Sequence, residues 1–391
     1  MMISLTGLPV WQIVLPGILF LILCLQLYYY LRYYMQPLYR MNAEKKHQIH
    51  YNQTKPGVSV IIYANNDSEQ LSANLPAFLE QDYPEYEVIV VNDGSSDETE
   101  EVLTDFENRY SHLYHTFLAE GARNLSRRKL SLTLGIKAAR YDIVLLSNAN
   151  CRPASAEWIS SMGRNFTEKT QLVLGYTRLE KKTGFGERFI AFDLLLRSLR
   201  ILGYALARKP YIGEGTNLAY RKSLFFENKG FAKYMHLHLG DDDLFINQVA
   251  TSRNTKVEIS EKAAMIANYQ HNGEGWSFLK RSNAFTANFY KSWAKQTFAI
   301  ESCTRYLFYA TAITGGWLFR TQPIILGILA AMVMIKWILQ SVFWFQAGKK
   351  LGTRRFIFCV PLFEVLDPLV NIFFKVSSYF HRKRNYTWRM S

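Results

Sequence analysis

Three consecutive aspartates, Asp241 to Asp243, are the side chains of this sequence best suited to acid–base chemistry. They follow Gly240 and stand at the start of a predicted helix. Carboxylates this close raise one another's pKa, which favours a general base that works near neutral pH, whereas the amino end of the helix opposes that rise. An acidic helix cap would also explain aspartates here, but a cap rarely needs three of them.

A second polar cluster lies in the segment VVNDGSSDETEE, at the end of a predicted buried strand. Asn92 and Asp93 stand at the tip of the strand, Gly94 turns the chain, and two serines lead into a helix. Asp93 can accept hydrogen bonds from a uracil or a ribose. An ordinary strand-to-helix turn with a capping serine explains the same residues, so the segment alone leaves both interpretations open.

Two asparagines, Asn148 and Asn150, follow another predicted strand in the segment DIVLLSNANCRP. The apolar run Ile143 to Leu146 predicts the strand, and the polar residues after it form a turn before Pro153. Mg²⁺ and Mn²⁺ prefer anionic oxygen ligands, whereas an amide offers a carbonyl oxygen without charge. The segment therefore indicates a metal site without its charges, a different kind of polar site, or a plain turn.

Predicted strands and helices alternate from Lys55 to about Gln270. Strand patterns occur in GVSVIIYA, EYEVIVVND and YDIVLLSN, and helical spacing occurs in SEQLSANLPAFLEQD, SSDETEEVLTDFENRY and SRRKLSLTLGIKAAR. This alternation predicts an α/β domain, Rossmann-like, with a mostly parallel sheet. Such sheets bind ligands at the carboxyl ends of their strands, so the polar residues that follow the strands are the expected site.

The chain begins with a run that is long enough to cross a membrane. Leu8 to Leu31 carry no charge, and the first charged side chain is Arg32; about 20 apolar residues span a bilayer. A secretory signal peptide would need a basic start and a small-residue cleavage site, which this run lacks. We therefore expect an uncleaved membrane helix with its amino terminus outside.

Further apolar segments lie near the carboxyl terminus. Pro323 to Gln346 predicts a full span in which Lys336 needs a polar partner or a route to the membrane surface, and Tyr306 to Phe319 is a marginal span. Phe356 to Phe380 contains two carboxylates and two prolines, which indicates a segment that does not cross fully. The sequence predicts two to three carboxyl-terminal membrane helices. An amphipathic basic segment, 185–209, predicts a helix either on the membrane surface or packed on the sheet.

The formal net charge of +14 is distributed beside the apolar runs. The basic clusters are Arg32, Arg40, Lys45 and Lys46, then Lys349, Lys350, Arg354 and Arg355, and finally Arg382, Lys383 and Arg384. This is the positive-inside pattern, which places the α/β domain on the cytoplasmic side of an inner membrane in contact with its lipids. No basic stripe with aromatics lies within the domain, so a nucleic-acid partner is not expected. The four cysteines are far apart, which argues against a disulfide framework or a zinc site.

Five motifs in order give the chain a family resemblance. They are VSVIIYANND, EVIVVNDGSSDET, RRKLSLTLGIKAARYDIVLLSNANCRP, GEGTNLAYRK and GDDDLFINQV, which together cover about Val58 to Arg281. In this order they resemble the membrane-bound inverting family-two glycosyltransferases, whose catalytic domain has the GT-A fold. The resemblance predicts a GT-A domain at 56–300, after an amino-terminal helix at 1–35 and a basic linker at 36–55, and before a membrane region with a basic tail at 301–391.

The resemblance also assigns roles to individual residues. Asp242 is the expected catalytic base, and Asp241 is the nearest rival, with a second possible role in orienting the acceptor. The remaining roles are nucleotide binding by Asp67, Asp93, Lys129 and Asn148, contact with the diphosphate or a metal by Asn150 and Arg281, and contact with the acceptor or donor sugar by Gly215, Asn217 and Trp276.

The resemblance makes the two asparagines informative, because family members have aspartates there that help bind a divalent ion. Losing both charges leaves three outcomes. An Mg²⁺ or Mn²⁺ ion binds weakly at Asn150, carried mainly by the nucleotide; basic side chains replace the ion; or the protein binds a ligand without turnover. The basic side chains considered for replacement are Arg152, Arg123, Lys129 and Arg281.

The expected function is transfer of a sugar from a nucleotide donor, UDP-linked, to a lipid-linked or glycan acceptor with inversion. The alternative is a non-catalytic binding or scaffold protein, motivated by the replaced carboxylate pair. The segment GEGWSFLKRSNAFTANFYKSW lacks the Gln-x-x-Arg-Trp motif that long-polysaccharide synthases carry, which argues against a processive polymerase.

Overall fold

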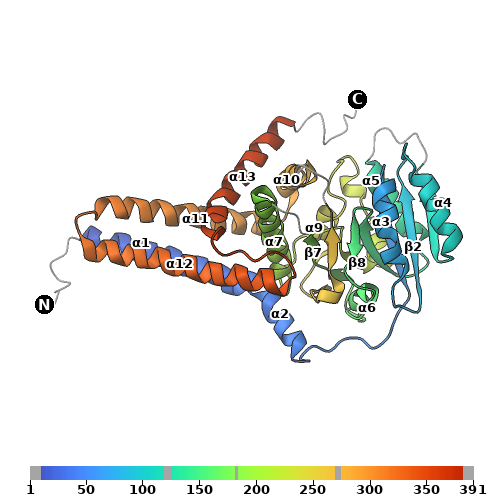
Figure 1. The fold of residues 1–391 in the computed structure, drawn as a ribbon, viewed down its shortest axis with the longest axis horizontal. Helices are drawn as coiled ribbons and strands as arrows, with labels where there is room; N and C mark the ends of the chain where they lie inside the picture. The colour runs from blue at the N-terminus through green and yellow to red at the C-terminus, as the bar shows by residue number, and fades with distance from the viewer. Residues whose placement is uncertain (1–9, 119–125, 181–183, 269–273, 382–391) are drawn as a thin grey trace.

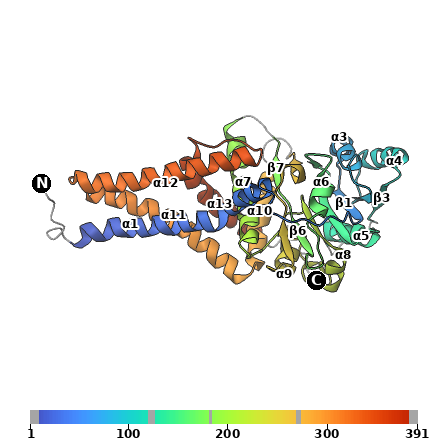
Figure 2. The same cartoon turned by 90° about the horizontal axis from the view of Figure 1, so that it is seen from below.

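The computed structural model describes residues 10–118, 126–180, 184–268 and 274–381. An α/β domain occupies one end of the molecule, and long helices extend from it as a bundle (Figure 1). The amino-terminal helix and two carboxyl-terminal helices make the bundle, so segments from both ends of the sequence lie side by side (Figures 1 and 2).

The central sheet has seven strands in the order β3-β2-β1-β4-β8-β6-β9. All neighbours pair in parallel except β8, which is antiparallel to both β4 and β6. The strands are β1 Val58–Ala64, β2 Tyr86–Asn92, β3 Leu113–Phe117, β4 Ile143–Asn148, β6 Leu172–Leu174, β8 Leu218–Arg221 and β9 Thr255–Val257. A second sheet contains β5 Cys151–Pro153, β10 Met265–Ala267 and β7 Thr177–Leu179. The predicted α/β class with a mostly parallel sheet is confirmed.

The register brings the predicted polar segments to one edge of the sheet. Asn92 lies opposite Ala64, and Asn148 lies opposite Tyr63, so β1, β2 and β4 end together. Strand β8 runs the other way, and its first residue, Leu218, pairs with the end of β4. The residues that precede β8 therefore reach the same edge as those that follow the parallel strands.

Helices cover both faces of the sheet, which explains why its central strands are apolar throughout. Successive side chains of a strand point to opposite faces. Val60 and Ile62 of β1 thus pack in one core with α3 and α4, whereas Ile61 packs in the other core with α5 and α7. The helices of the domain are α3 Ser68–Leu79, α4 Thr99–Arg109, α5 Arg127–Ala138, α6 Trp158–Gly163, α7 Phe185–Leu206, α8 Lys222–Glu227, α9 Asp243–Val249 and α10 Glu274–Thr286, with short 3₁₀ turns at 232–234, 261–263 and 287–289.

Helix α7 connects the α/β domain to the bundle. It contacts β7 and β9 and also α2 Gln36–Lys45. The close approach requires Gly203, because a Cβ there would lie 2.3 Å from the carbonyl oxygen of Tyr33. Of the two interpretations that the sequence left open, the structure supports a helix packed within the protein.

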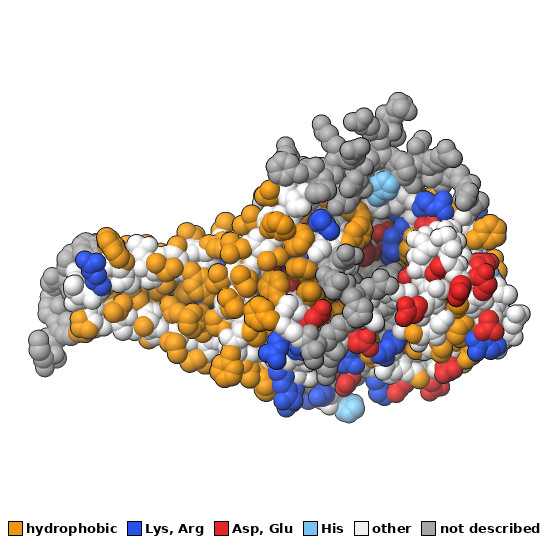
Figure 3. Space-filling view, turned by 45° about the horizontal axis from the view of Figure 1, so that its top comes forward, with side chains coloured by type: hydrophobic (Ala, Val, Ile, Leu, Met, Phe, Trp, Pro, Cys, Tyr) orange, Lys and Arg blue, Asp and Glu red, His pale blue; other side chains and the backbone are white. Residues whose placement is uncertain are grey.

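The bundle consists of α1 Val10–Tyr29, its π-helical continuation Tyr30–Tyr34, α11 Ser292–Leu318 and α12 Pro323–Lys350, and α2 Gln36–Lys45 follows α1. Within the described residues, two helices are long and apolar enough to cross a membrane, Gln12–Tyr34 and Pro323–Lys350. Hydrophobic side chains cover the visible surface of the bundle (Figure 3). The predicted boundary at residue 300 falls inside α11, and the division of the chain into domains stays a prediction.

Helix α13 Val360–His381 packs against α10 and α12. Its Glu364 carboxylate accepts hydrogen bonds from Lys336 Nζ at 3.1 Å and from Gln340 Nε2 at 2.7 Å. The sequence predicted that Lys336 needs a polar partner, and in the structure this partner is Glu364. Its carboxylate supplies the negative charge that a buried ammonium needs.

Candidate active site

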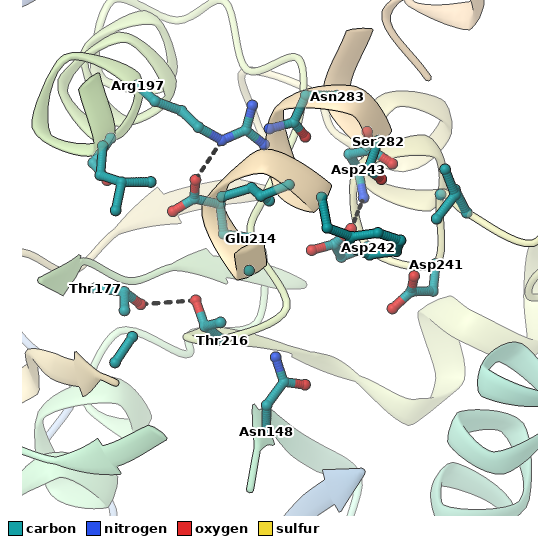
Figure 4. A pocket seen from close by; sticks show the side chains of 18 of the residues that line it. Asn148, Thr177, Arg197, Glu214, Thr216, Asp241, Asp242, Asp243, Ser282 and Asn283 are labelled. Atoms are coloured by element: carbon teal, nitrogen blue, oxygen red, sulfur yellow. Dashed lines mark hydrogen bonds and ion pairs between the residues drawn. The ribbon is translucent and has the colours of Figure 1, made fainter. Parts of the chain in front are cut away.

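A cavity of about 410 Å³ lies at the carboxyl edge of the sheet. Its walls come from the end of β4, the segment before β8, the start of α9, and one face each of α7 and α10. Figure 4 shows Asn148, Glu214 and the three aspartates of the acidic cluster around this space. Arg128 and Asn283 both line this space, so the cavity brings together residues that are up to 155 positions apart in the sequence.

Asp242 is held at the cavity by two backbone N–H groups. Its Oδ1 accepts from the N–H of Asp243 at 2.7 Å, which caps α9, and its Oδ2 accepts from the N–H of Gly215 at 2.6 Å. Burial raises the pKa of Asp242 to about 7, and the charges of Asp241 and Asp243 add to that rise. Each carboxylate oxygen keeps a further acceptor site, so Asp242 can take a proton near neutral pH.

Asp241 has a different partner and a different charge state. The guanidinium of Arg128 donates from Nε to Asp241 Oδ2 at 2.8 Å. Burial alone would raise the pKa of Asp241, but the Arg128 charge outweighs burial and holds this pKa below its ordinary value. Arg128 therefore favours the ionised form of Asp241, whose negative charge stands next to Asp242.

Asp243 also lines the cavity but is only 4% exposed. Its Oδ2 accepts from Thr286 Oγ1 at 2.5 Å and from the Tyr290 hydroxyl at 2.6 Å. Burial raises the pKa of Asp243, and these two hydrogen bonds oppose the rise. Asp243 thus ties the start of α9 to the end of α10 and to the turn that follows it.

The first turn of α5 contributes three successive cations with three different partners. Arg127 Nε donates to Asp93 Oδ1 at 2.8 Å. Arg128 reaches Asp241, and its Nη2 also donates to Asn148 Oδ1 at 2.8 Å. Consecutive side chains of a helix point about 100° apart, so three successive residues of one turn can contact three different parts of the protein.

Lys129, the third of these cations, is completely buried. Its ammonium donates to the backbone carbonyl oxygens of Tyr234, Leu237 and Leu239 at 2.6 to 2.8 Å. An ammonium has three donors, so all of them are used. The sequence predicted that Lys129 binds the nucleotide. In this structure Lys129 instead holds the segment that leads to the acidic cluster.

The two aspartates predicted to bind the nucleotide lie close together, on the side of Arg127. Asp93 is 4% exposed and accepts from the Tyr63 hydroxyl at 2.8 Å as well as from Arg127. Asp67 precedes α3, and its Oδ2 accepts from the N–H of Asn65, whose side chain donates to the Asp93 carbonyl oxygen. Burial raises the pKa of Asp67. The structure thus groups these residues next to the cavity rather than in its wall.

Two predicted sugar-binding residues have structural contacts. Asn217 is 1% exposed, accepts from Trp158 Nε1, and donates to the carbonyl oxygens of Tyr176 and Ala263. Trp276 Nε1 donates to Asp193 Oδ2 at 2.8 Å, which turns its indole toward α7 and α13. Neither residue forms the wall of the cavity. Gly215, by contrast, supplies the N–H group that Asp242 uses.

Two residues expected at the diphosphate also lie outside the cavity wall. Arg281 is half-buried on α10. Asn150 Nδ2 donates to the Asn268 carbonyl oxygen at 3.4 Å, and its Oδ1 accepts from the Cys151 thiol. Of the other basic candidates, Arg152 pairs with Glu180 at 2.9 Å, and Arg123 lies outside the described residues.

Sequence reasoning missed the arginines that do reach the site. Arg128 lines the cavity, and so does Arg197, whose Nε donates to Glu214 Oε1 at 2.7 Å. One signal was present for Arg128. Cations in the first turn of a helix oppose its dipole, so two arginines and a lysine directly after the Ser126 cap indicate anionic partners elsewhere.

The donor set does not fit a divalent metal ion. Asn148 and Asn150 carry no charge, and Asn148 Oδ1 already accepts from Arg128. The described residues contain no group of three or more His, Cys, Asp or Glu side chains that could hold a metal ion. A guanidinium occupies the space between Asp241 and Asn148 where such an ion would need oxygen ligands.

The fold and the site together define a glycosyltransferase of the GT-A class. A family model described as "Glycosyl transferase family 21" matches residues 18–391, so the chain belongs to that family. The class predicted from the sequence, a glycosyltransferase with the GT-A fold, is confirmed. The family model that matches is family 21, whereas the resemblance in the sequence was to family two.

The curated relatives match over part of their length. The poly-beta-1,6-N-acetyl-D-glucosamine synthase of Staphylococcus epidermidis is 33% identical over 100 residues, 25% of this chain and 23% of that protein. The probable glycosyltransferase YdaM of Bacillus subtilis is 28% identical over 179 residues, 43% of this chain and 41% of that protein. The dolichyl-phosphate beta-glucosyltransferase ALG5D of Trichomonas vaginalis is 30% identical over 128 residues, 31% of this chain and 38% of that protein. The chain thus spans less than half the length of each relative.

Among solved structures, the mannosyltransferase PcManGT of Pyrobaculum calidifontis, in complex with GDP-Man and Mn²⁺, aligns with 82% of this chain and 98% of its own. The sequence identity is 16% and the TM-score is 0.49.

Proposed function

We propose that this protein is a membrane-anchored glycosyltransferase that moves a sugar from a nucleotide donor, UDP-linked, to a lipid-linked or glycan acceptor with inversion. The observation that carries the proposal is Asp242, which faces the cavity with a pKa of about 7 and is fixed by two backbone N–H groups. A base with this pKa can accept the proton of an acceptor hydroxyl at physiological pH.

The proposed reaction is a direct displacement. The acceptor hydroxyl gives its proton to Asp242 while its oxygen forms a bond to the anomeric carbon of the donor sugar. The bond from that carbon to the phosphate oxygen breaks on the opposite face, and its electron pair leaves with the nucleoside diphosphate. Attack from the face opposite the leaving group inverts the configuration at the anomeric carbon. The reaction therefore has no covalent intermediate between sugar and protein.

Contacts between side chains connect the base to the proposed nucleoside site. Arg128 bridges Asp241 and Asn148, and its guanidinium stacks over the Tyr63 ring at 4.5 Å. Tyr63 in turn donates to Asp93, which is the proposed partner of the uracil. This sequence of contacts supports a donor that lies with its nucleoside near Asp93, its diphosphate near Arg128 and its sugar at Asp242.

The opposite wall of the cavity supports an acceptor with an apolar part. Leu194 of α7 and Phe278 and Leu279 of α10 line it, next to the polar pair Arg197 and Glu214. Helix α7 contacts the π-helical continuation of α1, and α10 packs against α13. One relative is named for a dolichyl-phosphate acceptor, which fits a lipid-linked substrate that reaches Asp242 from the membrane side.

The distribution of charge supports anchoring with the α/β domain at the cytoplasmic face of an inner membrane. Lys350 Nζ donates to Asn42 Oδ1 at 2.7 Å, so the basic clusters after the first apolar run and after α12 meet at the domain end of the bundle. Lys and Arg side chains gather at this junction in Figure 3. Positive charge at one end of membrane helices favours the cytoplasmic side.

The test uses the full chain purified in detergent, with a set of UDP-sugars, and measures UDP release and UDP binding. Asp242→Asn is expected to lower turnover by about 10²- to 10⁴-fold, the usual contribution of a general base. Asparagine is also a good helix cap, so the fold and UDP binding should persist. Asp105→Asn, an exposed carboxylate on α4, is the control that should keep full turnover.

Wild-type protein that binds UDP but releases none from any UDP-sugar would instead support the non-catalytic alternative. Full turnover in the Asp242→Asn variant would refute the assignment of the base.

A further inference from the structure

Two neutral amides stand where a metal-dependent site needs anionic oxygens. Asn148 Oδ1 accepts a hydrogen bond from Arg128. Asn150 has hydrogen bonds with Cys151 and Asn268, each at the long distance of 3.4 Å. A divalent ion between them would meet uncharged ligands on one side and a guanidinium on the other. Something other than a metal ion must therefore stabilise the negative charge of a leaving diphosphate here.

We infer that the Arg128 guanidinium takes the place of the divalent cation, so that this protein binds the donor diphosphate without metal. The inference rests on the proposed glycosyltransferase function and names the group that binds the donor in that site. Arg128 would act as a fixed cation that touches the diphosphate through N–H donors, next to the sugar but apart from the base.

The position of the guanidinium is fixed from three sides. Asp241 and Asn148 each accept from it at 2.8 Å, and the Tyr63 ring lies under it with 4.5 Å to the ring centroid. These hydrogen bonds use two of the five N–H donors of an arginine. The side chain is 31% exposed and forms part of the cavity wall, so its remaining edge can meet a ligand. A planar guanidinium can bind phosphate oxygens in pairs, which a single ammonium cannot.

The charges of the site agree with this replacement. A divalent ion between two aspartates adds no net charge to a site, because two negative charges cancel it. Here Arg128 beside Asn148 adds one positive charge, and Asp241 balances it. Asp241 is present in both cases. The site with Arg128 and no metal ion therefore carries no more negative charge than a site with two aspartates and a divalent ion would.

The two neighbours of Arg128 in the sequence are held by other partners. Arg127 is already paired with Asp93, and Lys129 holds three backbone carbonyl oxygens. Both therefore have contacts that explain a cation at the start of a helix, where the dipole opposes positive charge. Arg128 is the cation of this turn that lines the cavity.

The test measures UDP binding to the full chain in detergent by calorimetry, with EDTA, with Mg²⁺ and with Mn²⁺. Wild-type affinity is expected to be equal within about twofold in all three conditions. Arg128→Gln is expected to weaken binding in EDTA by about 10- to 100-fold, the effect of losing a charge-assisted contact. Lys137→Gln removes an exposed charge from the same helix and should leave affinity unchanged.

A second variant and a direct measurement guard against misfolding of Arg128→Gln. Arg128→Lys keeps the charge but loses the paired donors, and should weaken binding less than Arg128→Gln does. Titration of Mn²⁺ into the wild-type protein with UDP, followed by electron paramagnetic resonance, should show no Mn²⁺ bound beyond that held by UDP alone.

The outcomes separate the inference from the proposed function. UDP binding that disappears in EDTA and returns with Mn²⁺ would overturn the inference and leave the glycosyltransferase proposal standing. Equal affinities of wild type and Arg128→Gln in EDTA would also overturn it. If neither UDP nor any other nucleoside diphosphate binds in any condition, the proposed function itself is refuted, and the inference with it.

Discussion

The pH dependence of sugar transfer tests the geometry around Asp242 in detail. Burial and the charges of Asp241 and Asp243 raise the pKa of Asp242 to about 7, although hydrogen bonding from Gly215 opposes them. A base of this pKa is ionised in about a tenth of the molecules at pH 6, half at pH 7 and nine tenths at pH 8. Turnover at saturating donor should therefore rise about fivefold from pH 6 to pH 7, and less than twofold from pH 7 to pH 8.

The cause of the raised pKa can be tested by removing one neighbouring charge. Asp243→Asn takes away a like charge next to Asp242, and an asparagine oxygen can still accept from Thr286 or Tyr290. The pH of half-maximal turnover should fall below that of the wild type, because the ionised form of Asp242 is then less disfavoured. UDP release is measured at a series of pH values with the chain in detergent.

Asp105→Asn removes a charge far from the cavity and should reproduce the wild-type profile. A wild-type rate that stays flat across pH 6 to 8 would refute the assignment of Asp242 as a base with this pKa. A half-maximal pH that is identical in the wild type and Asp243→Asn would show that neighbouring charge is not the cause.

Three substitutions test the contacts that position the site, each by thermal unfolding in detergent. Lys129→Met leaves three buried carbonyl oxygens without their donor and should cost at least about 3 kcal/mol; unchanged stability would contradict the contacts of this lysine. Glu364→Gln leaves a buried ammonium without its counter-charge and should cost about 3 kcal/mol, whereas no loss would mean that water or lipid headgroups reach the pair. Gly203→Ala would place a Cβ 2.3 Å from the Tyr33 carbonyl oxygen and should cost about 1–3 kcal/mol; Gly186→Ala, where a Cβ meets nothing within 4 Å, is the control.

The elements of the sheet could be predicted from the sequence because their signals are local. Buried parallel strands appear as continuous apolar runs, and the helices between them show 3.6-residue spacing. The same patterns imply which residues follow each strand, and this is why the sequence predicts Asp93 and Asn148 at one edge of the sheet. The antiparallel direction of β8, which brings Gly215 to Asp242, depends on pairing between distant segments and has no local signal.

Side-chain direction on helices was harder to predict. The segment Glu274–Thr286 was expected to contribute Arg281 and Trp276, but the cavity is lined by five residues of the other face, Gly275, Phe278, Leu279, Ser282 and Asn283. Those five follow the i, i+3, i+4, i+7, i+8 rule for one helical face, and Trp276 lies outside it. Periodicity identifies a face, but only the packing of α10 against α7 and α13 decides which face meets the cavity.

The same limitation explains why Lys129 and not Arg128 was chosen from the sequence. Three successive basic residues at a helix start point in three directions, and their partners are 20 to 113 positions away along the chain. A cation count can show that anionic partners exist, but it cannot assign one partner to each cation.

The arrangement of Arg128 links the proposed cation to the proposed base. Arg128 keeps Asp241 ionised, and the Asp241 charge is one cause of the raised pKa of Asp242. At the same time Arg128 itself lowers the pKa of Asp242, so the two effects oppose each other through one guanidinium. The titration observed in a pH profile therefore belongs to the acidic cluster as a whole rather than to Asp242 alone. A bound diphosphate that draws the guanidinium toward its own charge would weaken both effects, so the proposed donor binding and the proposed proton transfer would be coupled through Asp241.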